Sequence, residues 1–448
     1  MPRDDNYFSV GAIASRRLSA LVPLRALLSA KTGFGANVVY MITGTALGQA
    51  ISVLFAPVLT RLYSPEQFGF LSVYMTVLLI IAVIAALGLE VAIPIAVSEA
   101  ELANLLAASG VAVVVTTCLV ALVTGLLPAS ALHFLQVGQL MSFRFLLPLG
   151  FACLGGYYVM VAVATRMAAF RDIAATRVSQ GISGPLSQII FGLLGTGSIG
   201  LTIGFVIGQS SGTILLLQRL VLQSPTLRAA ISWRGMLAVI RRYAGFPLLA
   251  TWARLLESCS GTIVFLLFAT CYSSEIAGFL FLTDRVVGRP LLIISTSLLQ
   301  VFTGEAGRAV QQDPAKLEQR FWQVVPRQFV ICLAWVVVTN IAAIWAFPIV
   351  FGNQWNDAIP YLHAMSATYL AMGVLHPVSM SLQLLERQVL ATAWQSLRLA
   401  LIIAAVIIPW HFGLSALAAL WLTSLVQVLS CFGMLVLIAI SVRRIQPE

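Results

Sequence analysis

The sequence has very little charge. Only 9% of its 448 residues are charged, and 60% are hydrophobic, whereas a typical soluble domain has about 25% charged and roughly 45–50% apolar residues. This composition excludes a soluble protein. At about 20 residues per crossing, a chain of this length holds about a dozen transmembrane helices, and it leaves no room for a large catalytic domain outside the membrane.

Lysine, histidine and cysteine are also scarce, and their positions exclude several kinds of site. Neither of the two lysines, Lys31 and Lys316, follows a glycine, so the phosphate-binding loop of ATPases is absent. The 4 histidines lack the spacing of metal ligands, and the 6 cysteines form no CxxC pair. The arginines are dispersed between apolar runs rather than gathered into a stripe, although the net charge is +10. We therefore expect no metal site, disulfide, cofactor or nucleic-acid partner.

Twelve apolar runs are long enough to cross a membrane, and they predict an all-α polytopic membrane protein. Glycines interrupt the two runs between 174 and 218, so we expect irregular or kinked helices there. The predicted runs are 36–60, 68–96, 103–127, 145–165, 174–196, 199–218, 244–270, 276–303, 329–350, 358–385, 389–410 and 414–440.

Basic residues are distributed unevenly among the connections between these runs. They gather in the N-terminal segment 1–35, the even-numbered connections and the C-terminal tail 441–448, whereas the odd-numbered connections hold only Arg61 and Arg144. Basic residues are retained on the cytoplasmic side of membrane proteins. Both termini are therefore predicted to be cytoplasmic.

A short internal repeat divides the chain into two halves. YSPEQFGFL (63–71) and YSSEIAGFL (272–280) share six residues, and each copy lies between the first and second predicted helix of its half. Six helices per half would enter the membrane in the same direction, which is a parallel repeat. The prediction is an N-lobe (36–220), a cytoplasmic basic linker (221–243) and a C-lobe (244–440).

Charged side chains inside the predicted helices are costly, at roughly 2.5–3.5 kcal/mol each at the bilayer centre, and therefore mark a cavity or an ion pair. Arg254 and Glu257 share one helical face, as do Arg285 and Arg289. Glu257 and Arg285 are expected at a similar depth, where they could meet. The charged residues inside the predicted helices are Glu90, Arg254, Glu257, Asp284, Arg285, Arg289 and Arg398.

Two interpretations of these charges remain open. Arg254, Glu257, Asp284 and Arg285 could form static ion pairs between helices. Alternatively, surplus arginines contact an anionic substrate, because the arginine fork matches phosphate oxygens. Arg289 has no acidic neighbour at ordinary helical spacing. The carboxylates Glu90, Glu257 and Asp284 are candidates for coupling to an ion, since burial and neighbouring charges shift carboxyl titration in opposite directions.

Several segments, taken in order, resemble a known family. Their order and spacing are similar to those of bacterial oligosaccharide flippases of the O-antigen and capsule type, within the superfamily that also contains multidrug antiporters. The segments are LTRLYSPEQFG (59–69), LGLEVAIPIAVSEAELANLLAAS (87–109), YAGFPLLATWARLLESCS (243–260), AGFLFLTDRVVGRPLLIISTSLLQVF (277–302), FGNQW (351–355) and LLERQVLATAWQSLRL (384–399).

This resemblance implies a V-shaped alternating-access transporter in the bacterial inner membrane. The implied substrate is an undecaprenyl-diphosphate-linked oligosaccharide, moved from the cytoplasmic to the periplasmic leaflet for O-antigen, capsule or exopolysaccharide synthesis without any bond being changed, so the protein is not an enzyme. The bilayer is one partner, with a proton or sodium as coupling ion and polysaccharide polymerase machinery as further candidates. The expected cavity cations are Arg254, Arg285, Arg289 and Arg398. A small-solute or multidrug antiporter and a membrane polysaccharide polymerase or ligase are the alternatives.

Overall fold

The computed structural model describes residues 34–127, 140–243, 246–312, 314–385 and 387–443. Within these ranges all regular secondary structure is helical. The N-lobe consists of α3 (Phe34–Leu54), α4 (Ala56–Leu62), α5 (Pro65–Ala82), η2 (Leu89–Val91), η3 (Ile93–Ile95), α6 (Glu99–Leu126), α8 (Leu140–Arg166), α9 (Phe170–Leu193), α10 (Gly197–Leu216) and η4 (Leu217–Leu222). The basic N-terminal segment lies almost wholly outside the described residues.

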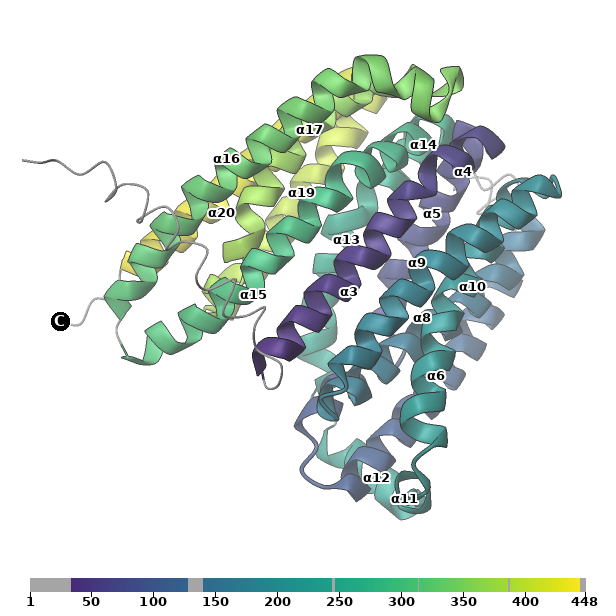
Figure 1. The fold of residues 1–448 in the computed structure, drawn as a ribbon, viewed down its shortest axis with the longest axis vertical. Coiled ribbons are helices and arrows are strands. Elements are labelled where there is room, and N and C mark those ends of the chain that lie inside the picture. Colours follow the sequence, from purple (N-terminus) through teal and green to yellow (C-terminus); the bar gives the residue numbers. More distant parts are fainter. Residues whose placement is uncertain (1–33, 128–139, 244–245, 313, 386, 444–448) are drawn as a thin grey trace, which may run out of the picture.

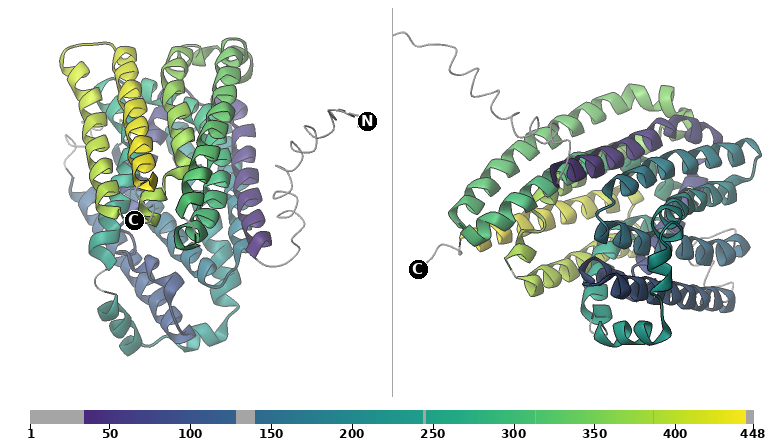
Figure 2. Two further views of the ribbon diagram at one scale, coloured as in Figure 1. Left: turned by 90° about the vertical axis from the view of Figure 1, so that its left-hand side faces the viewer. Right: turned by 60° about the horizontal axis from the view of Figure 1, so that its bottom comes forward.

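Two short helices, α11 (Pro225–Ala229) and α12 (Trp233–Arg242), connect the lobes. The C-lobe consists of α13 (Phe246–Cys271), α14 (Ser274–Thr283), η5 (Asp284–Gly288), α15 (Arg289–Gln312), α16 (Pro314–Ala346), η6 (Phe347–Phe351), η7 (Asn353–Trp355), α17 (Ala358–Leu375), η8 (His376–Val378), α18 (Ser381–Leu384), α19 (Gln388–His411) and α20 (Ala416–Arg443). Figures 1 and 2 show the two lobes as adjacent bundles.

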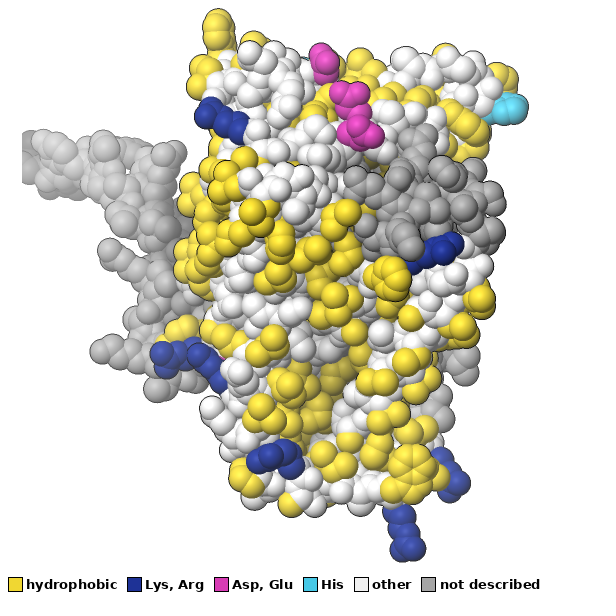
Figure 3. All heavy atoms as spheres, turned by 90° about the vertical axis from the view of Figure 1, so that its right-hand side faces the viewer, with side chains coloured by type: hydrophobic (Ala, Val, Ile, Leu, Met, Phe, Trp, Pro, Cys, Tyr) yellow, Lys and Arg dark blue, Asp and Glu magenta, His cyan; other side chains and the backbone are white. Residues whose placement is uncertain are grey.

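The predicted fold class is confirmed, because all regular secondary structure in the described residues is helical and each predicted apolar run contains an α-helix, although the run 68–96 is α-helical only as far as Ala82. Among the described residues, 10 helices are long and apolar enough to cross a membrane. The two runs that fall short, α9 and the α14–η5–α15 segment, carry polar and charged side chains that line internal cavities. Hydrophobic side chains cover much of the outer surface between the two ends, and most of the visible basic side chains lie toward the lower end (Figure 3).

Glycines in the N-lobe allow helices to pack closely. A Cβ atom at Gly44 would lie 2.4 Å from Ala174 Cβ, and one at Gly48 would lie 2.4 Å from Arg177 O. From the other helix, a Cβ at Gly181 would lie 2.4 Å from Gly48 O. The glycines do not interrupt α9 or α10, each of which is continuous, although α9 contains Pro185 and α10 passes into the π-helical η4 at Leu217. Glycine here allows close contact with neighbouring backbones.

The two copies of the internal repeat pack against each other and join the lobes. Gly69 on α5 and Gly278 on α14 are the contact points. A Cβ at Gly69 would lie 1.7 Å from Ser274 O, and a Cβ at Gly278 would lie 1.9 Å from Pro65 O. Each repeat thus meets the start of the other repeat's helix through a residue without a side chain, which is the reciprocal contact that a two-fold relation produces.

The FGNQW segment strengthens the same junction. The Trp355 indole is fully buried and donates from Nε1 to Thr60 O at 2.9 Å. Its ring packs edge-on against Phe68, with 5.1 Å between centroids. Nearby, Arg61 Nη2 donates to Ile349 O at 2.8 Å. Apolar packing and hydrogen bonds therefore hold the lobes together at this end of the molecule.

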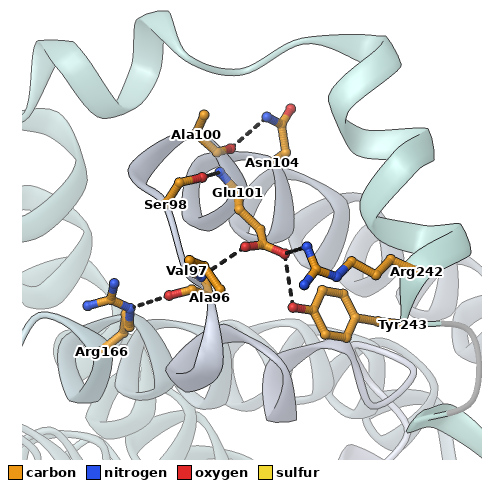
Figure 4. Close-up of polar contacts among 9 residues, drawn as sticks. All are labelled: Ala96, Val97, Ser98, Ala100, Glu101, Asn104, Arg166, Arg242 and Tyr243. Carbon is orange, nitrogen blue, oxygen red and sulfur yellow. Dashed lines mark hydrogen bonds and ion pairs between the residues drawn. The ribbon is translucent and has the colours of Figure 1, made fainter.

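At the opposite end, the connecting helices are attached to the N-lobe through Glu101 (Figure 4). The Glu101 carboxylate accepts hydrogen bonds from Val97 N and Tyr243 Oη, both at 2.9 Å, and pairs with Arg242 at 3.0 Å. Burial and the hydrogen bond to Glu101 raise the pKa of the Tyr243 phenol, so the phenol remains a donor. Asn104 also binds this segment, accepting from Ser232 N at 2.9 Å.

Candidate functional site

Among the described residues, two cavities contain charged side chains. The N-lobe cavity is lined mainly by N-lobe helices, together with Phe281, Asp284, Arg285 and Arg289, and the C-lobe cavity is lined by C-lobe residues. The N-lobe cavity has a volume of about 380 Å³ and the C-lobe cavity about 420 Å³. Asp284 and Arg289 line both of them. Asp284 at the start of η5 and Arg289 directly after it therefore form part of the wall between the two cavities.

Arg289 and Asp284 form an ion pair, with Arg289 Nε 2.9 Å from Asp284 Oδ2. The sequence prediction that Arg289 lacks an acidic partner is therefore wrong. Residues five apart are not neighbours on an α-helix, but η5 is a π-helical turn with i→i+5 hydrogen bonds, which brings these two side chains together. Gly288 makes room for the carboxylate, because a Cβ there would lie 2.7 Å from Asp284 Oδ1.

Arg285 connects the two lobes. Its Nη2 atom donates to Ser52 Oγ at 2.8 Å and to Ser52 O at 3.2 Å, on α3 of the N-lobe. Both acceptors are neutral. In the part of the chain that the structure describes, no carboxylate pairs with Arg285. The guanidinium lines the N-lobe cavity, so its charge is available to an anion there.

Arg254 also crosses between the lobes, where it pairs with Glu90. Glu90 lies in η2 because the second predicted helix ends early: Leu87 and Gly88 have positive φ values of 51° and 75°, a conformation that an α-helix cannot continue. The Glu90 side chain is 7% exposed. The predicted ion pairs between the seventh and eighth helices therefore have the wrong partners, since Arg254 binds Glu90 and Asp284 binds Arg289.

Glu257 remains without an ion pair among the described residues. It lines the C-lobe cavity and is exposed there, whereas Arg285 lines the N-lobe cavity and is bonded to Ser52. The prediction that Glu257 and Arg285 lie at similar depth and could meet is therefore wrong, because the two residues line different cavities.

Arg398 is the one predicted cation that is both buried and free of hydrogen bonds at two nitrogens. Its side chain on α19 lines the C-lobe cavity, the residue is 9% exposed, and Nε and Nη2 have no partner within the described residues. Of the four expected cavity cations, Arg285, Arg289 and Arg398 line cavities, whereas Arg254 is not among the lining residues.

Sequence reasoning missed the polar lining of the N-lobe cavity. Gln49, Gln180 and Gln209 line it together with Tyr158 and Arg177. Gln180 Nε2 donates to Gln209 Oε1 at 3.3 Å, which joins α9 to α10. The sequence signal for this polar lining is that each of these glutamines lies inside a predicted membrane helix. Arg177 lies about two turns inside α9, which begins at Phe170.

Among the described residues, no group of three or more His, Cys, Asp or Glu side chains is arranged to hold a metal ion. What the cavities offer instead is arginine nitrogens, amides and tyrosines. Such groups can bind anionic and hydroxyl-rich molecules by hydrogen bonds.

The fold is similar to those of known transporters. An inward-facing multidrug resistance transporter of the MATE family has a TM-score of 0.63 and 13% identity, with 95% of this chain and 99% of that chain covered. An outward-facing MATE family transporter has a TM-score of 0.61 and 16% identity, with 91% and 95% covered. A superfamily transporter from Pyrococcus furiosus, described as having a binding pocket of reversed polarity, has a TM-score of 0.61 and 15% identity, with 92% and 96% covered.

Comparison of sequences assigns the chain to a family, although no curated protein matches it. The sequence model for polysaccharide biosynthesis proteins matches residues 58–360, a span that includes both repeat copies, the linker and the charged η5 turn. The chain therefore belongs to the polysaccharide biosynthesis protein family and has the fold of a MOP superfamily membrane transporter.

Proposed function

We propose that this protein moves a lipid-linked oligosaccharide, attached through a diphosphate to undecaprenol, from the cytoplasmic to the periplasmic leaflet of a bacterial inner membrane. The lining of the N-lobe cavity is the observation that carries this proposal. It holds three arginines, Arg177, Arg285 and Arg289, against one acid, Asp284. A net positive cavity inside the membrane suits a diphosphate and opposes the binding of cationic drugs.

The uncharged part of the same lining suits a saccharide. The amides of Gln49, Gln180 and Gln209 offer both donors and acceptors, and Tyr158 offers a ring face and a hydroxyl. Sugar hydroxyl groups also donate and accept, so they can satisfy these groups when the cavity is filled. Arginine for the phosphates and amides for the sugars together match the two parts of a lipid-linked oligosaccharide head group.

The conformation fits the first half of such a transport cycle. The lobes are joined at the end formed by the repeat and FGNQW, and with the orientation predicted from the arginines this end is periplasmic. The cavities would then load from the cytoplasmic side. Transport requires the junction to open while the opposite end closes, which is the exchange of states that alternating access describes.

A flipping assay tests the proposal. The purified protein is reconstituted in vesicles with undecaprenyl diphosphate that carries a fluorescent oligosaccharide, and a membrane-impermeant quencher reports the fraction that changes leaflet. We expect wild type to equilibrate the probe, Arg285→Gln to be strongly impaired and Arg285→Lys to be intermediate, because lysine keeps the charge but loses the fork.

Arg387→Gln is the matched control for these variants. Arg387 bonds Ser441 and lines neither cavity, so flipping should be unchanged. Flipping of wild type no faster than in protein-free vesicles would refute the proposal, and export of cationic drugs by the same vesicles would favour the multidrug antiporter.

A further inference from the structure

The C-lobe cavity contains a cluster of buried polar atoms that have no partner within the described residues. They are Arg398 Nε and Nη2, Trp394 Nε1, Gln395 Oε1, Ser260 Oγ and His376 Nε2. Buried polar atoms in folded proteins nearly always have a hydrogen-bond partner, so each exception needs an explanation. Five residues with such atoms around one cavity point to a polar occupant.

The free edge of Arg398 defines the charge of that occupant. Nε and Nη2 lie on one side of the planar guanidinium, and this pair of N–H groups matches two oxygens of one carboxylate or phosphate. Glu257 lines the same cavity, but no ion pair joins it to Arg398 in the part of the chain that the structure describes. The buried cation therefore lacks a counter-charge that an oxyanion would supply.

The neighbours of Arg398 on α19 add a donor and an acceptor. Trp394 and Gln395 precede Arg398 by four and three residues, so all three share one face of the helix. Trp394 is held in place by α20, because a Cβ at Gly433 would lie 2.7 Å from its indole ring. The indole N–H can only donate, whereas Gln395 Oε1 can only accept. The acceptor fits a hydroxyl group beside the oxyanion.

We infer that the C-lobe cavity binds an oxyanion flanked by hydroxyl groups, with Arg398 and Trp394 donating to the anion and Gln395 accepting from a hydroxyl. A sugar phosphate and a uronic acid, whose anion is a carboxylate, share this chemistry. The volume of about 420 Å³ falls in the range of roughly 300–1,000 Å³ typical of small-molecule sites. That the anion belongs to a transported oligosaccharide rests on the function proposed above, but the site itself does not.

Binding to the full-length protein in lipid nanodiscs tests this site. The probes are glucose 1-phosphate, methyl glucuronide and uncharged methyl glucoside, titrated by calorimetry and by tryptophan fluorescence. We expect saturable binding of at least one anionic probe and much weaker binding of methyl glucoside. Arg398→Gln should weaken anion binding roughly 10- to 100-fold, and Trp394→Phe by less, since it removes a single neutral donor.

The control is Arg387→Gln, which removes an arginine beside the same helix but outside the cavity and should bind normally. If Arg398→Gln does not fold, Arg398→Lys and Trp394→Phe provide the same comparison. Binding of the phosphate alone or of the glucuronide alone supports the site and identifies the source of the anion. Equal binding of the uncharged sugar, no binding of any probe, or binding that Arg398 and Trp394 variants leave unchanged would overturn it.

These outcomes are independent of the flipping assay. Anion binding that depends on Arg398 in a protein that flips no lipid-linked oligosaccharide would retain the site and refute the proposed function. Flipping without such binding would retain the function and refute the site.

Discussion

Replacing either glycine of the junction between the lobes should force the lobes apart at that end. In Gly278→Ala the new methyl group would lie 1.9 Å from Pro65 O, and in Gly69→Ala it would lie 1.7 Å from Ser274 O. Both obstacles are backbone atoms in helices, so no side-chain rotation can relieve the overlap. Overpacking of this kind costs about 1–3 kcal/mol, which corresponds to a change of roughly 5- to 150-fold in the ratio of the joined to the separated state.

Distance measurement between spin labels tests this prediction. Labels at Arg61 and Ile349 report the junction, because the two residues are in hydrogen-bond contact across it and both are exposed. We expect a single short distance in the parent protein without native cysteines, and a population at longer distance in Gly69→Ala and Gly278→Ala.

Gly110→Ala is the matched control, since nothing lies within 4 Å of a Cβ at Gly110 on α6. It should leave the distances unchanged. An unchanged distribution in both junction variants, with unfolding midpoints equal to the parent's, would show that these glycines do not set the separation of the lobes.

Three further predictions follow from the ion pairs and the orientation. Arg254→Ala should lower the free energy of unfolding by about 1–3 kcal/mol, because it leaves the buried Glu90 carboxylate unpaired. Adding Glu90→Gln should recover part of the loss in the unfolding midpoint. An unchanged midpoint in the single variant would show that this ion pair does not stabilise the protein. Glu101→Gln should speed amide hydrogen exchange in α12 while the unfolding midpoint stays the same, since only the attachment of the connecting helices is weakened. Unchanged exchange in α12 would contradict this prediction. In a variant without native cysteines, a cysteine at Asn356 should react with an impermeant reagent from the periplasm and one at Gln312 should not, and the reverse result would overturn the orientation.

The helical fold could be predicted from the sequence because the length of an apolar run and the position of a repeat can both be read from local sequence. The lengths of the runs identified the helices, and the repeat at 63–71 and 272–280 identified two related lobes. The contact between the repeats through Gly69 and Gly278 could not be predicted, because similarity between two segments does not show whether they touch.

The pairing of the charges could not be predicted, for identifiable reasons. The π-helical turn at η5 places Asp284 against Arg289, and a rule based on 3.6 residues per turn cannot anticipate that contact. The break at Leu87 and Gly88 lies within a continuous apolar run, where Gly88 and Pro94 are the only sequence signs of a helix end, and it determines where Glu90 meets Arg254. Arg398 was singled out from sequence by its place in an apolar helix, whereas the cluster around it depends on packing between α13, α19 and α20.

The ion pair between Asp284 and Arg289 has a thermodynamic consequence for the two cavities that it lines. Arg289 lines both cavities in this structure, so we expect an anion that draws its guanidinium toward the N-lobe cavity to weaken its contact with the C-lobe cavity. Ligands in the two cavities are then linked, and linkage is reciprocal: the factor by which the first changes the affinity for the second equals the factor by which the second changes the affinity for the first. We therefore expect binding in one cavity to change the affinity of the other, through the ion pair at this single π-helical turn.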